Sequence, residues 1–389
     1  MAGKKLELFT SIPKFILIMY KFSLYLFLIY VTLLISSCEK DESEIAVEVE
    51  KQLIEQLNTC KREKYDISFL HISDTHGSNY TLAYMVSMLN KTDALFGIIT
   101  GDLVLTSSME HTISSSTKPI FVLPGNHDAY DNMSQYWFRK QILNTSRWKS
   151  LMIFGDVDAN YYYVDIYTNN KQIRLICLDQ YELEAVGIEC AYNIIMSQKQ
   201  IDWFIKSLES AEQYDAIIVA MHCGFGNSTK GGRDFSNQNK FVSIKTNPES
   251  YEFSGPADPC MIPDIINSYL SGDNISKNYS SGDSRVDLKV ETNFKTEHSN
   301  FVFYIGGHIH MDVAEYLNYY PNQLQSIISS AYYVCPSSYD DLARESTGIN
   351  AITMNDCLID ISNREIQLIR LGARNILNGS VRDEITFSY

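Results

Sequence analysis

Five short apolar segments of this sequence each end in side chains that can bind a metal ion. Each segment is most simply interpreted as a strand followed by a polar loop. The side chains at the five ends are Asp74 with His76, Asp102, Asn126 with His127, His222, and His308 with His310. Any one of them alone could be an ordinary turn or core residue. Because ligands of α/β sheets gather at the carboxyl ends of strands, the five together predict a fold that brings these loops to one site.

The loop after the third segment carries three such polar residues in a row. The apolar run 120–123 leads through Gly125 into Asn126, His127 and Asp128. Glycine permits a backbone turn that a side chain would block, which leaves the amide and the imidazole free to point at one spot. The alternative is that these polar groups only satisfy the backbone of their own loop.

The order of apolar and amphipathic segments predicts an α/β fold. Strands are expected at 67–72, 94–99 and 120–123, with a helix at 80–89, a pattern typical of βαβ units and a largely parallel sheet. The further strands expected are 161–166, 173–178, 216–221, 301–305, 313–317, 325–328, 350–354, 358–361 and 366–371, and the further helices are 132–143, 197–211 and 261–270.

The sequence predicts one domain at residues 65–375. Residues 224–300 are rich in Gly, Ser, Asn and Asp and are expected to form an insertion, in which Arg233 is a candidate phosphate contact. Residues 376–389 are expected to form a C-terminal tail.

The set of donor groups favours a two-metal centre. Carboxylate, amide and imidazole groups without thiolate suit Mn, Fe, Zn or Mg. A carboxylate can bridge two cations, and a water bridging them would become hydroxide near neutral pH. The formal net charge of −15 argues against stable binding to nucleic acid. Bound cations would supply the positive centre that a phosphate-ester substrate needs in so acidic a protein.

The ordered motifs resemble those of the calcineurin-like metallophosphoesterases. The matching blocks are Asp74-x-His76, Gly101-Asp102, Gly125-Asn126-His127-Asp128, His222 and Gly307-His308-x-His310, within residues 67–312. The resemblance implies a four-layer αββα sandwich of two mixed sheets and the hydrolysis of phosphoric mono- or diesters.

The resemblance also implies roles for individual residues. The implied metal ligands are Asp74, His76 and His310 at the first metal, Asn126, His222 and His308 at the second, and Asp102 as the bridge. His127 would contact the phosphate and protonate the leaving oxygen, and Asp128 would orient His127. The alternative is that His127 and Asp128 only brace their loop. Leu105 stands where purple acid phosphatases of this superfamily have a tyrosine ligand, so a tyrosinate-bound ferric site is not implied.

The first 38 residues resemble the signal peptide of a bacterial lipoprotein. A basic stretch precedes the apolar run 22–35, which meets Ser36, Ser37 and Cys38. Cys38 would then be lipidated, and residues 39–64 would form a tether with a short helical pattern at 47–57. The acidic start of this tether resembles those that direct some lipoproteins to the outer face of the outer membrane. We therefore expect an extracytoplasmic protein, lipid-anchored to the outer membrane. The alternative is an uncleaved transmembrane anchor, although the apolar run is shorter than the roughly 20 residues that a span needs.

One alternative function comes from a different class. The chain could be an envelope-anchored binding or scavenging module built on the phosphoesterase fold.

Of the eight cysteines, the seven beyond Cys38 cannot all pair within one chain, so most are expected to be buried small side chains. The substrate and the oligomeric state are left open by the sequence.

Overall fold

The computed structural model divides into two compact units, residues 1–49 and residues 50–389. It describes residues 42–58, 64–130, 135–168, 170–182, 196–225, 261–279, 288–308, 313–317, 320–328, 330, 348–373, 375–377, 380–382 and 384–389. The described part of the first unit belongs to helix α2 (Glu42–Asn58), whose second half lies in the second unit. None of the helices within these described ranges combines the length and the apolar character that a membrane span requires.

The first sheet of the second unit has six strands. In spatial order they are β17 (Glu384–Ser388), β14 (Glu365–Gly372), β13 (Thr353–Asp360), β1 (Ile67–Ile72), β2 (Gly97–Ile99) and β3 (Ile120–Val122). The neighbours β1, β2 and β3 are parallel, whereas β13, β14 and β17 join antiparallel to them. The sheet is therefore mixed rather than largely parallel, and the carboxyl ends of β1, β2 and β3 lie at one edge.

The second sheet has seven strands and is also mixed. In spatial order they are β11 (Val313–Leu317), β12 (Tyr320–Ile327), β10 (Phe301–Gly307), β7 (Ala216–Cys223), β6 (Lys171–Cys177), β5 (Tyr162–Thr168) and β4 (Met152–Phe154). The central strands β12, β10, β7 and β6 are parallel, and both edges are antiparallel. Strands β7 and β10 are buried along their whole length, which matches their continuous apolar sequences.

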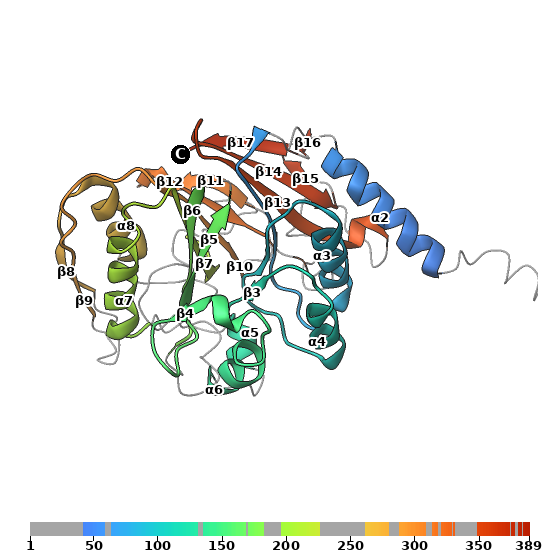
Figure 1. Ribbon diagram of the computed structural model, residues 1–389, viewed down its shortest axis with the longest axis horizontal. Coiled ribbons are helices and arrows are strands. Elements are labelled where there is room, and N and C mark those ends of the chain that lie inside the picture. Colours follow the sequence, from blue (N-terminus) through green and yellow to red (C-terminus); the bar gives the residue numbers. More distant parts are fainter. Residues whose placement is uncertain are drawn as a thin grey trace, which may run out of the picture. The chain divides into compact units, whose positions relative to one another are not determined.

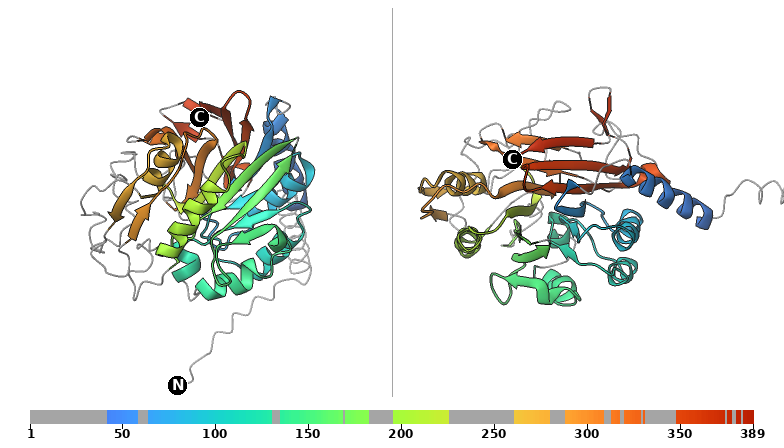
Figure 2. Two further views of the ribbon diagram at one scale, coloured as in Figure 1. Left: turned by 60° about the vertical axis from the view of Figure 1, so that its left-hand side comes forward. Right: turned by 45° about the horizontal axis from the view of Figure 1, so that its top comes forward.

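The two sheets pack face to face with helices outside them, which confirms the predicted sandwich. Phe69 of β1 and Phe303 of β10 meet between the sheets with ring centroids 6.3 Å apart. Figure 1 shows α3 and α4 beside the first sheet and α7 and α8 beside the second, and Figure 2 shows the same layers from two further sides. The helices of the second unit are α3 (Asn79–Lys91), α4 (Ser107–Ser114), α5 (Asn126–Tyr130), α6 (Gln135–Phe138), α7 (Gln198–Glu209) and α8 (Met261–Ser271), with a π-helix at Arg139–Leu143 and 3₁₀ turns at Lys149–Leu151 and Ile349–Ala351.

Helix α7 illustrates how local sequence sets these elements. Ser197 caps its start by accepting a hydrogen bond from the backbone N–H of Gln200. Ile201, Phe204 and Leu208 recur at helical spacing and are buried against the second sheet.

The chain ends of the second unit differ from the sequence prediction. The short helix expected at 47–57 is confirmed within α2. Its residues Leu53 and Leu57 are buried, as residues of a free tether would not be. The side chain of Gln56 accepts a hydrogen bond from the backbone N–H of Gly372 at 2.9 Å, so residues 50–58 belong to the folded unit. At the other end, the predicted tail contributes β17, because its alternating sequence pairs with the free edge of β14.

Two internal segments also differ from the sequence prediction. The predicted strands 350–354 and 358–361 are one strand, β13, because polar Asp356 in its middle is buried and accepts a hydrogen bond from Ser68 Oγ at 3.0 Å. In the predicted insertion, α8 is confirmed, and the described residues also contain the hairpin of β8 (Ser276–Tyr279) and β9 (Leu288–Glu291). A second small hairpin joins β15 (Asn375–Leu377) and β16 (Ser380–Arg382).

Candidate metal centre

The predicted ligands lie in loops at the ends of strands from both sheets. Asp74 and His76 follow β1, Asp102 follows β2, and Asn126 begins α5 after β3. From the second sheet, His222 lies at the end of β7 and His308 directly follows β10. His310, the remaining predicted ligand, lies outside the described residues, as do Arg233 and Cys38.

The loops after β1 and β2 are held together by their backbones. Asp74 donates its N–H to the carbonyl of Gly101 at 3.0 Å, and His76 donates to the carbonyl of Asp102 at 2.9 Å. Four predicted ligands have positive φ angles: Asp74 at 53°, His76 at 45°, Asp102 at 51° and His308 at 74°. A left-handed backbone conformation of this kind costs about 1–3 kcal/mol per residue. It is kept only where the surrounding contacts hold it in place, which is typical of functional sites.

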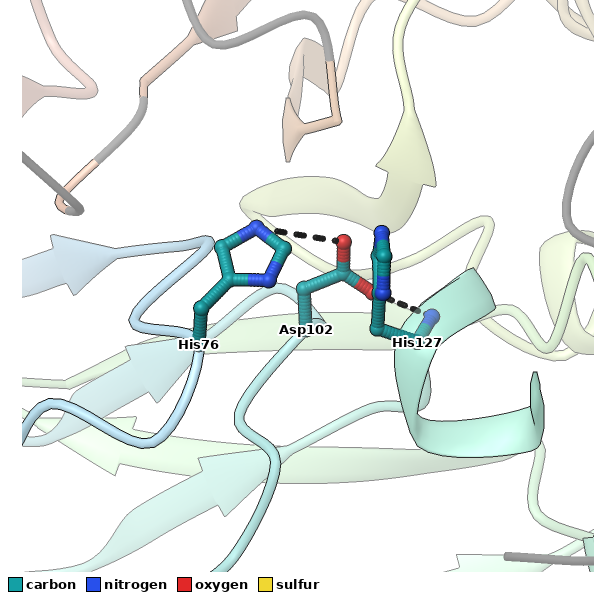
Figure 3. A group of neighbouring side chains, drawn as sticks. All are labelled: His76, Asp102 and His127. Atoms are coloured by element: carbon teal, nitrogen blue, oxygen red, sulfur yellow. Dashed lines mark hydrogen bonds and ion pairs between the residues drawn. The ribbon is translucent and has the colours of Figure 1, made fainter. Parts of the chain in front are cut away.

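Two groups of side chains converge closely enough to hold a cation. Ligand atoms of Asp74, Asp102 and His222 lie within 4.8 Å of one another, and so do those of His76, Asp102 and His127. Asp102 belongs to both groups, as the predicted bridging role requires. Figure 3 shows its carboxylate between the rings of His76 and His127.

Asn126 joins the histidines of the second sheet. Its Oδ1 atom lies 3.0 Å from Nε2 of His222 and 2.9 Å from Nδ1 of His308. The other ring nitrogen of His222, Nδ1, donates to the carbonyl of Thr100 at 2.7 Å, which directs Nε2 at Asn126 and Asp102. Carbonyl oxygen and imidazole nitrogen thus point at a common position, as ligands of one cation do.

The charges of the site fit a cation as well. Burial by itself would raise the pKa of Asp102, but nearby His222, with His127 and His76, holds that pKa well below its ordinary value. Burial would lower the pKa of His222, but Asp102 raises it to about 9, helped by Asp74 and the Thr100 carbonyl. The Oδ2 atom of Asp102 is buried and makes no hydrogen bond within the described structure, while His222 Nε2 lies 3.3 Å and His76 Nε2 3.7 Å from it. A divalent cation would satisfy this carboxylate, so the residues fit the predicted metals.

The two predicted catalytic residues, His127 and Asp128, make different kinds of contact. His127 is half-buried, and its ring meets that of His76 edge to face with centroids 4.7 Å apart. The Asp128 carboxylate accepts the backbone N–H groups of Leu103, Val104 and Gly125 at 3.2, 2.8 and 2.9 Å. Burial, followed by the charge of Asp102, raises the pKa of Asp128 to about 6 against the effect of these hydrogen bonds. Through these contacts Asp128 braces the loops, and its role in orienting His127 stays a prediction.

Sequence reasoning missed several residues that shape the site. A Cβ atom at Gly101 would collide with His222, and one at Gly307 would collide with Asp74. The repeated order of glycine before ligand, at Gly101-Asp102, Gly125-Asn126 and Gly307-His308, is a signal that could have found this close packing. The carbonyl of Thr100 has no such signal, because any residue supplies a carbonyl.

Other residues have the roles expected of core residues. His71 is fully buried and its Nε2 lies 2.9 Å from Thr100 Oγ1. Cys177, Cys223 and Cys357 are free and buried. Cys223 lies beside His222 in the chain and its sulfur is 2.9 Å from the hydroxyl of Tyr181.

The sandwich of two mixed sheets with a cluster of carboxylate, amide and imidazole groups at its strand ends defines the class of a metal-dependent hydrolase. The family model of the calcineurin-like phosphoesterases matches residues 67–312, and the chain belongs to this family. Membership supports metal-dependent hydrolysis of phosphoric esters as the general activity.

Comparison with solved structures gives distant similarities. The chain is similar to a dimetal phosphatase from Danio rerio, with 10% sequence identity and a TM-score of 0.47, over 84% of this chain and 99% of that one. It is also similar to a putative 5'-nucleotidase from Staphylococcus aureus, with 13% identity and a TM-score of 0.36, over 83% of this chain and 54% of that one. No curated protein matches the sequence.

Proposed function

We propose that this chain hydrolyses phosphoric esters at a two-metal centre. The proposed ligands are Asp74, His76 and His310 for the first metal, Asn126, His222 and His308 for the second, and Asp102 between them. The observation that carries the proposal is the position of the Asp102 carboxylate, which takes part in both groups of potential ligands. One of its oxygens is buried and has no hydrogen bond to any residue that the structure describes. When bound, the two ions would offset the charge of the phosphate and lower the pKa of a water between them.

The protein's own residues would position the ester and move the proton. The carboxylates of Asp74 and Asp102 are buried within the site. His127 is the more exposed group at its rim and would donate a proton to the alcohol oxygen as it leaves phosphorus. Asp128 keeps the His127 loop in place through its three backbone hydrogen bonds.

The test is the hydrolysis of chromogenic phosphate mono- and diesters by the purified chain, with and without added Mn²⁺. We expect turnover that depends on the metal and that falls by about 100-fold or more in Asp102→Asn, because several kcal/mol of transition-state stabilisation are lost. Asp156→Asn is the matched control, since this carboxylate is exposed and pairs with Lys199 away from the site. Equal rates for Asp102→Asn and the control would refute the proposed two-metal mechanism. Fewer than one transition metal ion per chain after reconstitution would favour the binding or scavenging module.

We further propose that Cys38 anchors the protein to the outer membrane. The support is the order of basic, apolar and small residues before Cys38 in the sequence. Expression in a bacterial host with a labelled fatty acid should give a labelled, membrane-bound protein, and Cys38→Ala should lose the label. Label retained by Cys38→Ala would contradict the proposal.

A further inference from the structure

Three buried glutamines each hold one other residue by its backbone. In every case the amide of the glutamine accepts the N–H and donates to the C=O of the same residue, as a neighbouring strand would do. The pairs are Gln200 with Asp179, Gln180 with Cys223, and Gln325 with Phe225. All three glutamine side chains are buried.

Gln180 acts at the point where strand β7 loses its neighbour β6, while β10 still pairs with Cys223 on the other side. The last residue pair between β6 and β7 is Cys177 with Ala220. Beyond it, the backbone N–H of Cys223 donates to Gln180 Oε1 at 2.5 Å, and Gln180 Nε2 donates to the Cys223 carbonyl at 3.0 Å. The glutamine amide therefore replaces the missing strand at the residue that follows His222.

The loop that carries Gln180 is itself held from helix α7. Gln200 Oε1 accepts the N–H of Asp179 at 2.8 Å, and Gln200 Nε2 donates to the Asp179 carbonyl, also at 2.8 Å. The same Nε2 atom donates to Glu182 Oε2 at 2.8 Å. A continuous set of buried hydrogen bonds thus runs from α7 through Gln180 to the backbone beside His222.

His222 needs this support because its ring has a narrow choice of orientation. Its Nδ1 must reach the Thr100 carbonyl while its Nε2 faces Asn126 and Asp102. A shift of the backbone at 222–223 would turn Nε2 away from the other ligands. Groups that orient metal ligands in this way typically change metal affinity by about 10- to 100-fold when they are removed.

We propose that Gln180 is a positioning residue for the metal ligand His222, a statement that rests on the proposed function. Its two hydrogen bonds to Cys223 fix the end of β7, so that His222 Nε2 meets Asn126 Oδ1 at the second metal position. Gln180 acts through Cys223 and needs no contact with the substrate.

The experiment compares Gln180→Leu with Gln323→Leu in the full chain. Gln323 is an equally buried glutamine that bonds Tyr304 and the Pro263 carbonyl, so its loss is a matched control for stability alone. Mn²⁺ affinity is measured by calorimetric titration of the metal-free proteins, and the visible spectrum of the Co²⁺-loaded proteins reports the ligand geometry. Gln180→Asn is a milder variant, because it keeps the amide but is one methylene too short to make both bonds to Cys223 without a shift of the backbone.

We expect Gln180→Leu to weaken the second Mn²⁺ by about 10- to 100-fold and to alter the Co²⁺ spectrum. Gln180→Asn should show a smaller loss, and Gln323→Leu should bind both ions as wild type does. If Gln180→Leu does not fold, the loss in Gln180→Asn decides the question. Wild-type affinity and spectrum in the folded Gln180 variants would overturn this proposal and leave the proposed function standing, whereas a wild-type protein that binds no Mn²⁺ would overturn both.

Discussion

The Oδ1 atom of Asp102 accepts a hydrogen bond from the backbone N–H of His127 at 2.8 Å. The next residue, Asp128, returns the contact, because its carboxylate accepts the N–H groups of Leu103 and Val104, which follow Asp102. The loops after β2 and β3 therefore hold each other by reciprocal bonds. This exchange fixes the distance between the proposed bridging ligand and the proposed proton donor.

Asp128→Ala should destabilise the protein by about 3 kcal/mol. The change removes the acceptor of three buried N–H groups, and each unsatisfied group costs about 1–3 kcal/mol, less where water enters the space. The measurement is the free energy of unfolding in denaturant. Asp156→Ala, an exposed carboxylate, should change it by less than about 0.5 kcal/mol. Similar small effects of both variants would show that Asp128 does not brace the loops.

His127→Asn should slow alkyl phosphate hydrolysis by about 10²–10⁴-fold and nitrophenyl phosphate hydrolysis much less. A general acid matters most where the leaving alcohol is a poor leaving group and needs a proton. The measurement is kcat for both substrates, together with the metal content. Equal losses for the two esters, or loss of a metal ion from the variant, would assign His127 to metal binding, as its place beside His76 and Asp102 also permits.

The site was more predictable from the sequence than the edges of the fold. Predicted ligands such as Asp102 and His222 follow apolar runs, and a buried strand with a polar end is visible in a single sequence. The structure brings together every predicted ligand that it describes, although the first and the last, Asp74 and His308, lie 234 positions apart in the chain. Asp128 was less predictable, because a carboxylate that bonds its own loops has the same sequence pattern as one that orients a histidine.

The remaining differences arise from contacts that are distant in sequence. The polar residue Asp356 suggests a strand end in the sequence. In the structure it lies inside β13, opposite Leu70 of β1 and Ile369 of β14, and it bonds to Ser68. The strand β17 is short and half-polar, so its place is decided by the open edge of β14. The hydrogen bonds from Gln180 to Cys223 could not be predicted from the sequence either, because they depend on where β6 ends relative to β7.

His71 should reduce stability in acid. Burial, followed by the charge of Arg370, lowers the pKa of His71 to about 3, while the unfolded chain takes up the proton near 6.5. The folded state thus binds fewer protons between these values, and stability is lost as pH falls from about 6.5 toward 3, by about 1.4 kcal/mol per pH unit. His71→Gln removes this titration and can keep a bond to Thr100. As the pH falls from 6.5 to 5, the free energy of unfolding of His71→Gln should rise by about 2 kcal/mol relative to that of the wild type. A difference that does not change with pH would contradict the lowered pKa of His71.

Asp179 should make the folded protein less stable as the pH rises, which is the opposite of the effect of His71. Burial, followed by the charge of Glu182, raises its pKa from 3.8 to about 8. The folded state therefore holds a proton that the unfolded state has released, and stability falls as pH rises from about 4 to 8. Asp179→Asn cannot ionise, so its unfolding free energy relative to wild type should rise by about 2–3 kcal/mol between pH 5 and 7, above a constant offset from altered hydrogen bonds. Glu182→Gln should flatten the wild-type slope in part, because it removes the second cause of the shift. Parallel pH curves for wild type and Asp179→Asn would mean that Asp179 is ionised in the folded protein.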